Sequence, residues 1–182
     1  MAALTHPPLL LLLAAVASLT VAAVSEDPSS PSTLQENCAH TPFPNLCVTH
    51  LSLMPESHTA DAHNFAELAI RAAASTASKT SAFIDNTLEA AVNDSTWQQC
   101  LNDCAESYID AVEQLDDSTG AMESNKYPDV KRFVAAAVTD VETCQEGCKA
   151  AVFPEKTKVA EMNEEVKNLC AVVLDLVGRL PN

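Results

Sequence analysis

Four cysteines are the residues of this chain whose type and spacing are best suited to chemistry: Cys100 with Cys104, and Cys144 with Cys148. Each pair spans one turn of a segment with a helical pattern, so both of its sulfurs lie on one helical face. If the two helices run antiparallel, Cys104 faces Cys144 and Cys100 faces Cys148, with the two rungs about 6 Å apart. Such a cluster can form two disulfides or bind one zinc ion tetrahedrally.

The N-terminal segment indicates the compartment, which bears on the choice between disulfides and zinc. Residues 9–24 are apolar, small residues surround Ala23, and a polar stretch begins at Ser25. This pattern predicts a secretory signal peptide over residues 1–23 and a flexible lead over residues 24–32. A membrane anchor is the alternative, but the apolar stretch is short for a span of ~20 residues and no basic cluster follows it. Secretion implies an oxidising compartment, which favours disulfides over zinc.

The chain is strongly acidic, with a formal net charge of −15, and no charged side chain precedes Ser25. This balance argues against nucleic acid and anionic membranes as partners of the mature chain. Acidic side chains also recur at steps of three and four along one helical segment, as a stripe of Asp103, Glu106, Asp110, Glu113 and Asp117. We interpret this stripe either as a solvated face or as a contact surface for a basic protein.

The rest of the chain is typical of an all-α protein, because glycine is rare, alanine is abundant and strand patterns are missing. Four periodic segments, at about 60–91, 95–117, 128–148 and 154–178, place apolar residues at alternating steps of three and four. This spacing predicts an up-down-up-down four-helix bundle over residues 60–178. A shorter unit over residues 33–52 is interrupted by Pro42 and Pro44, which predicts a small helical hairpin. We therefore expect one helical domain over residues 33–182.

No pattern for catalysis or cofactor binding is found. The chain has no glycine-flanked serine nucleophile, no phosphate-binding glycine loop and no zinc-protease motif. His50, His58 and His63 lack ligand spacing, so we expect no metal site, no cofactor and no enzymatic activity. Cys170 lies on the apolar side of the last helix, which predicts a buried free thiol. Asn93 begins the sequence Asn-Asp-Ser, a candidate glycosylation site.

Several motifs, in order, connect the chain with a known family. Cys38 and Cys47 enclose Thr-Pro-Phe-Pro, Cys104 precedes Tyr108 and an Asp-Ala-Val run, and Thr143-Cys144-Gln-Glu-Gly and Leu169-Cys170 follow. Across the whole mature sequence the chain resembles the plant invertase and pectin methylesterase inhibitors.

The resemblance implies a four-helix bundle with an N-terminal helical hairpin, and bridges Cys38–Cys47 and Cys104–Cys144. Cys100 and Cys148 depart from the family pattern, and their spacing predicts an added bridge. The resemblance also implies that the bundle docks over the substrate cleft of a carbohydrate-active enzyme and performs no chemistry itself.

The choice of target enzyme depends on the turn between the second and third bundle helices. Well-known invertase inhibitors have Pro-Lys-Phe there, whereas this chain has Lys126, Tyr127, Pro128 and Asp129 as its candidate contact residues. This difference and Leu169-Cys170 favour pectin methylesterase, and acid invertase is the alternative target. Two other functional classes stay open. One is a non-inhibitory structural or ligand-carrying protein of the cell wall or pollen, and the other is a redox-active or metal-binding protein. We expect a secreted monomer of the apoplast, or of the vacuole if the target is vacuolar invertase.

Overall fold

The structure is a computed structural model that describes residues 33–91 and 95–181. The predicted signal peptide, the predicted lead and Asn93 lie outside these residues. The described part contains helices and no strand: α1 (Thr33–Ala39), α2 (Pro44–Leu51), a 3-10 turn η1 (Pro55–His58), α3 (Ala62–Ala90), α4 (Ser95–Glu123), α5 (Tyr127–Gly147) and α6 (Lys156–Gly178). None of these helices combines the length and the apolar character needed to cross a membrane.

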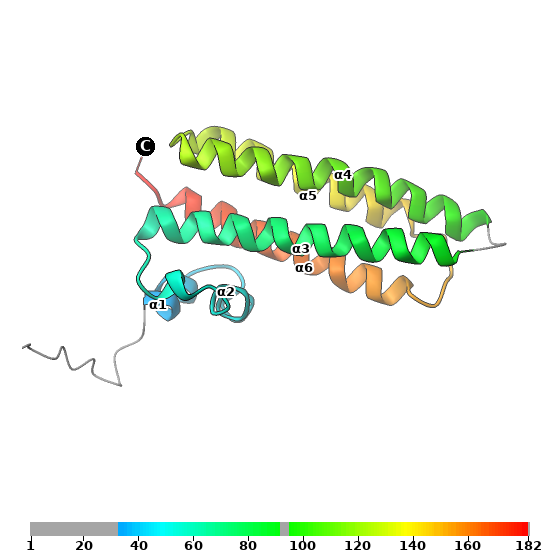
Figure 1. The fold of residues 1–182 in the computed structure, drawn as a ribbon, viewed down its shortest axis with the longest axis horizontal. Helices are drawn as coiled ribbons and strands as arrows, with labels where there is room; N and C mark the ends of the chain where they lie inside the picture. Colours follow the sequence, from blue (N-terminus) through cyan, green and yellow to red (C-terminus); the bar gives the residue numbers. More distant parts are fainter. Residues whose placement is uncertain (1–32, 92–94, 182) are drawn as a thin grey trace, which may run out of the picture. The chain divides into compact units, whose positions relative to one another are not determined.

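The four long helices lie side by side and form the predicted four-helix bundle (Figure 1). Helix α3 packs against α4 and α6, and α5 packs against the same two helices. Each long helix therefore has two neighbours, and the apolar faces of all four meet in one core. The prediction of an all-α bundle with an N-terminal hairpin is confirmed.

The core follows the apolar rows that define the helices in the sequence. On α4 the row Leu101, Cys104, Tyr108, Ala111 and Leu115 is completely buried. Each fully buried large aliphatic side chain contributes about 1.5–3 kcal/mol relative to its exposed state. Five of the twelve buried residues of α3 are alanines, which allow the neighbouring helices to approach closely: Ala66, Ala69, Ala72, Ala73 and Ala77.

Helix α4 is longer than the sequence pattern suggests, because it continues through Gly120 to Glu123. Ala121 and Met122 are buried, and their burial offsets the cost of about 1 kcal/mol for glycine inside a helix. Asn125, two residues after the last residue of the helix, has φ 55°. The amide of the next residue donates to the carbonyl of Ala121 at 2.9 Å, and the Asn125 amide donates to the carbonyl of Met122 at 2.9 Å. This is the Schellman arrangement, in which asparagine can replace glycine.

The hairpin of α1 and α2 packs against one end of α3 and α6 (Figure 1). Leu34 and Leu51 are buried in the common core, and the Cys38–Cys47 disulfide joins the two short helices. A side-chain contact of 2.9 Å between His50 Nε2 and Glu165 Oε1 also connects α2 to α6. The hairpin is thus closed by its own disulfide and held against the bundle by apolar and polar contacts.

Candidate functional site

The surface of α4 is the most strongly charged helical surface of the described chain. The helix carries seven carboxylates and no lysine or arginine: Asp103, Glu106, Asp110, Glu113, Asp116, Asp117 and Glu123. Of the predicted stripe, Asp103 is half-buried and the other four side chains are exposed. Gln99 Nε2 donates to Asp103 Oδ1 at 2.9 Å. Within the described ranges, none of the seven carboxylates forms an ion pair.

Helix α5 extends this acidic surface through Asp140. Burial raises the pKa of the Asp140 carboxyl, and the nearby negative charge of Asp110 raises it further. Asp140 is not among the contact residues predicted from the sequence. The register set by Cys104 and Cys144 could have indicated it, because Asp140 precedes Cys144 by one turn and so faces the part of α4 that follows Cys104.

The turn between α4 and α5 holds the second predicted set of contact residues. Lys126 and Pro128 are exposed, whereas Tyr127 and Asp129 are half-buried. The Tyr127 hydroxyl donates to Asn125 Oδ1 at 3.0 Å, and its ring lies edge-on to the His63 ring with centroids 6.1 Å apart. Only Lys126 and Pro128 are thus fully free for a partner.

The structure does not bring the turn and the stripe together into one small site. Glu113 precedes the end of α4 by ten residues, or about 15 Å along the helix, and Asp103 lies about 30 Å from that end. A partner that contacts both the turn and Asp103 must therefore extend over about 30 Å of the helix.

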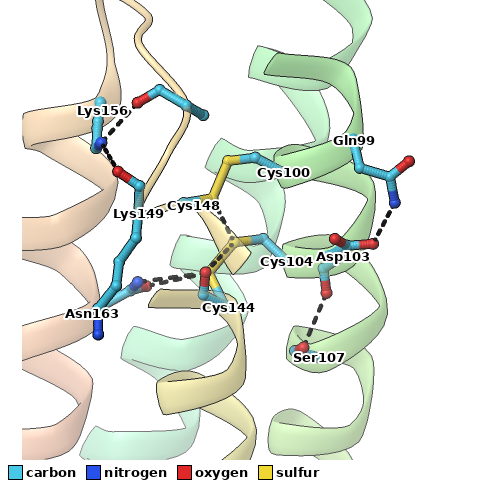
Figure 2. Close-up of a disulfide and its surroundings, with 11 residues drawn as sticks. Gln99, Cys100, Asp103, Cys104, Ser107, Cys144, Cys148, Lys149, Lys156 and Asn163 are labelled. Carbon is cyan, nitrogen blue, oxygen red and sulfur yellow. Dashed lines mark hydrogen bonds between the residues drawn. A yellow bond between two sulfur atoms is a disulfide. The ribbon is translucent and has the colours of Figure 1, made fainter. Parts of the chain in front are cut away.

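The cysteines connect the first turns of α4 to the last turns of α5, away from the turn that joins these helices. Figure 2 shows the two bridges and their surroundings. Disulfides join Cys100 to Cys148 and Cys104 to Cys144, with Cα atoms 4.8 and 4.2 Å apart. Together with Cys38–Cys47, these are the three pairs expected from spacing and resemblance. Cys170 is a buried free thiol, and burial raises its pKa to about 12. The bridges hold the α4 surface and α5 in a fixed register.

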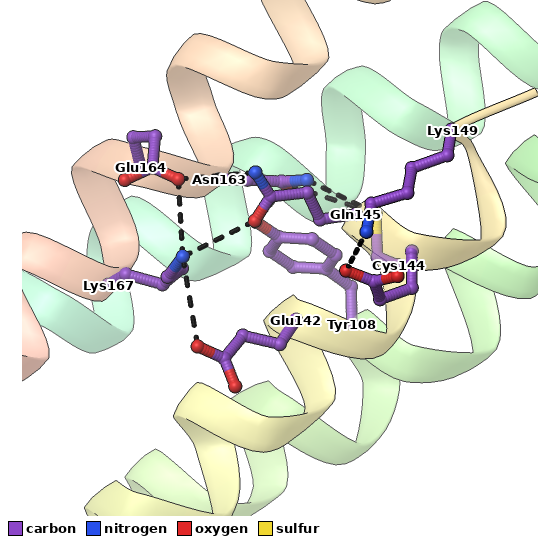
Figure 3. A network of polar contacts seen from close by, with 9 residues as sticks. Tyr108, Glu142, Cys144, Gln145, Lys149, Asn163, Glu164 and Lys167 are labelled. Atoms are coloured by element: carbon purple, nitrogen blue, oxygen red, sulfur yellow. Dashed lines mark hydrogen bonds and ion pairs between the residues drawn. The ribbon is translucent and has the colours of Figure 1, made fainter.

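A buried polar network, which the sequence analysis missed, lies beside the inner bridge (Figure 3). The Tyr108 hydroxyl donates to Asn163 Oδ1 at 2.7 Å, and Asn163 Nδ2 donates to Cys144 Sγ at 3.4 Å. Burial raises the pKa of Tyr108, and a hydrogen bond with the Thr80 hydroxyl acts in the opposite direction. This network fixes α4, α5 and α6 to one another through side chains that are at most 1% exposed.

A second group of polar contacts, centred on Lys167, lies next to this network on α5 and α6 (Figure 3). Lys167 Nζ donates to Gln145 Oε1 at 3.3 Å and to Glu164 Oε1 at 3.2 Å, and it lies 3.8 Å from Glu142 Oε1. Acidic side chains on this side of the bundle therefore have a basic partner, in contrast to those of α4.

The fold defines the chain as a disulfide-tied four-helix bundle with an N-terminal helical hairpin. The family model described as plant invertase/pectin methylesterase inhibitor matches residues 32–176. The chain belongs to this family of inhibitor proteins, and it is not an enzyme, as predicted.

Relatives within the family carry names of both target classes. The chain is 24% identical to the cell wall / vacuolar inhibitor of fructosidase 2 of Arabidopsis thaliana, over 86% of this chain and 88% of that protein. It is 26% identical to a pectinesterase inhibitor of Actinidia deliciosa, over 81% of this chain and 79% of that protein. It is also 26% identical to pectinesterase 3 of Phaseolus vulgaris over 84% of this chain, but it spans only 28% of that protein.

A solved structure shares the fold. A mutant form of a pectin methylesterase inhibitor from Arabidopsis superposes with a TM-score of 0.70 at 20% identity, covering 83% of this chain and 99% of that chain.

Proposed function

We propose that this chain is a secreted inhibitor that binds pectin methylesterase in the plant cell wall and covers its substrate cleft. The observation that carries the proposal is the α4 surface, where seven carboxylates lie on one helix without a basic partner among the described residues. Uncompensated charge of one sign attracts a partner of the opposite sign and accelerates association.

The dimensions of this surface suit an enzyme cleft. Asp103 and Asp117 are separated by about 21 Å along α4, given a rise of ~1.5 Å per residue. A stable interface buries roughly 800 Å² on each partner, which one helix and the neighbouring face of α5 can supply. Because the three disulfides and the buried Tyr108–Asn163 contact fix the helices, little order has to be gained on binding.

Two observations favour pectin methylesterase as the target. The α4–α5 turn lacks the Pro-Lys-Phe tripeptide of well-known invertase inhibitors, and a relative over most of the chain is named a pectinesterase inhibitor. The similarity to an inhibitor of fructosidase over a larger share of this chain supports acid invertase as the second candidate. For a vacuolar invertase, the location would be the vacuole.

A paired titration tests the proposal. The mature chain is added to a plant pectin methylesterase and to an acid invertase at mildly acidic pH, and residual activity is measured. We expect inhibition of the pectin methylesterase at micromolar concentration or below. Inhibition of invertase alone would favour the second candidate. Inhibition of neither enzyme would contradict both and leave a non-inhibitory cell-wall role.

Charge neutralisation tests the role of α4. The triple variant D103N/E106Q/D110N keeps side-chain size, and the side-chain amide oxygen introduced at position 103 can still accept from Gln99. We expect association with the enzyme to slow by about tenfold at low salt and its salt dependence to flatten. The matched control E36Q/E56Q/E89Q removes the same charge from exposed positions on α1, η1 and α3. If both triple variants show equal rates and salt slopes, the stripe is only a solvated face.

A further inference from the structure

The four cysteines of α4 and α5 form one compact sulfur cluster as well as two bridges. Sγ of Cys104 lies 3.4 Å from Sγ of Cys148, across the two bridges. The sulfurs of Cys100, Cys104 and Cys148 all lie within 4.8 Å of one another, and Cys144 Sγ is bonded to Cys104 Sγ. All four residues are at most 5% exposed. The fold therefore gathers four sulfurs at one point beneath the surface.

This arrangement is close to the one that zinc requires. Zinc bound by four thiolates has Zn–S distances of ~2.3 Å in a tetrahedron, which places neighbouring sulfurs about 3.8 Å apart. Among Cys100, Cys104 and Cys148, the non-bonded sulfurs are 3.4 Å apart in one pair and at most 4.8 Å apart in the other, which is compatible with this value. Once the two S–S bonds are broken, the bonded sulfurs move apart by van der Waals repulsion, and the tetrahedron is reached by small side-chain rotations.

The surroundings of the cluster suit a negatively charged metal site. Asn163 Nδ2 already donates to Cys144 Sγ, and such N–H donors stabilise metal-bound thiolates. Lys156 Nζ donates to the main-chain oxygens of Lys149 and Ala151, just after Cys148, so its positive charge is fixed near the cluster. A surface cavity of about 220 Å³ is lined by residues that include Cys148, Lys149, Lys156 and Asn163. This cavity gives a path from solvent to the sulfurs.

We propose that the four cysteines, when both bridges are reduced by a dithiol, form a tetrahedral thiolate site for one zinc ion. Each S–S bond accepts two electrons and two protons from one dithiol, which leaves as its own disulfide. Zinc then binds the four sulfurs and displaces their thiol protons to solvent. Zinc would hold α4 and α5 in the same register as the two bridges, so that the two forms of the cluster exclude each other.

The experiment uses the full chain, reduced and kept free of oxygen, with Co(II) as a spectroscopic probe that zinc displaces. We expect one equivalent of Co(II) to give the visible bands and intense sulfur charge-transfer absorption of a tetrahedral four-thiolate site. One equivalent of zinc should abolish these bands, and circular dichroism should show a higher melting temperature with zinc. The oxidised chain should bind neither metal.

Two matched double variants identify the ligands. C38S/C47S removes the hairpin bridge and should leave the spectrum and the stoichiometry unchanged. C100S/C148S leaves two of the four sulfurs and should lose the four-thiolate spectrum and weaken zinc binding by about 100-fold or more. The single variants C100S and C148S, each with three sulfurs, should give altered spectra even if the double variant does not fold. The proposal would be overturned by an unchanged Co(II) spectrum in C100S/C148S or by loss of metal binding in C38S/C47S. It would also be overturned if the reduced chain neither binds one equivalent of zinc nor gains helicity with it.

Discussion

Removal of the two α4–α5 bridges should destabilise the protein in a non-additive way. The sequence separations are 48 residues for Cys100–Cys148 and 40 for Cys104–Cys144. In the chain-entropy description, each bridge alone would contribute about 4 kcal/mol at 25 °C. When one bridge is present, however, the second closes only a ring of about ten residues, and it adds about 2.6 kcal/mol.

The variants C100A/C148A and C104A/C144A should therefore each lower the free energy of unfolding by about 2.6 kcal/mol. The variant without both bridges should lose about 6.6 kcal/mol, which exceeds the sum of the two single losses by about 1.4 kcal/mol. The excess arises because the last remaining bridge constrains the whole loop of 40 or 48 residues.

Urea unfolding of the oxidised variants measures these free energies by linear extrapolation. The hairpin variant C38A/C47A serves as control, because its bridge closes a separate loop with a separation of 9 residues. Its loss should add to that of either α4–α5 variant within about 0.5 kcal/mol. Additive losses for the two α4–α5 bridges would refute the loop reasoning, as would a negligible loss for C100A/C148A.

Three further predictions concern single residues. Y108F leaves the buried side-chain carbonyl of Asn163 without its donor, so the free energy of unfolding should fall by about 1–3 kcal/mol. A decrease below about 0.5 kcal/mol in urea unfolding would contradict the assigned contact. Burial raises the pKa of Cys170 to about 12, so iodoacetamide at mildly alkaline pH should modify this thiol only after the chain is unfolded in denaturant without reductant. Mass spectrometry measures the labelling, and stoichiometric labelling of the native chain would argue against burial. The pKa of Asp140 is raised in the folded state by burial and by Asp110, so the folded state retains this proton to higher pH than the unfolded state. Its ionisation therefore opposes folding above the folded-state pKa, and this penalty disappears as the pH falls toward the ordinary value of 3.8. D140N should thus be more stable than the parent at neutral pH and lose this advantage in acid, and parallel stability curves for the two proteins would count against the coupling.

Periodicity predicted most of the core, since the face that a helix buries is encoded within a few turns of its own sequence. The α5 row of Val130, Val134, Ala137 and Val141 is fully buried, as expected. The same reasoning failed at one position of α6. The alternating three- and four-residue spacing of the apolar residues in α6 places Met162 on the core side, but Met162 is half-buried, whereas its polar neighbour Asn163 is 1% exposed.

The error at Asn163 has a clear physical cause. A hydrophobic pattern assigns polar residues to the surface, because burial of an unpaired amide is costly. Asn163 escapes this cost because the Tyr108 hydroxyl and the Cys144 sulfur supply its partners from two other helices. No sequence pattern within α6 indicates these partners.

The sequence by itself determined the helices, because their apolar spacing is local, and the membership of an inhibitor family, because its motifs follow one another along the chain. The cysteine pairing was expected from spacing together with the resemblance. The tertiary structure alone decided which charges are compensated. Lys167 of α6 lies 3.8 Å from Glu142 of α5, while the carboxylates of α4 have no basic partner among the described residues. It also placed Asp140 near Asp110. These outcomes depend on distances between residues far apart in the chain, and such distances are set only when the four helices pack.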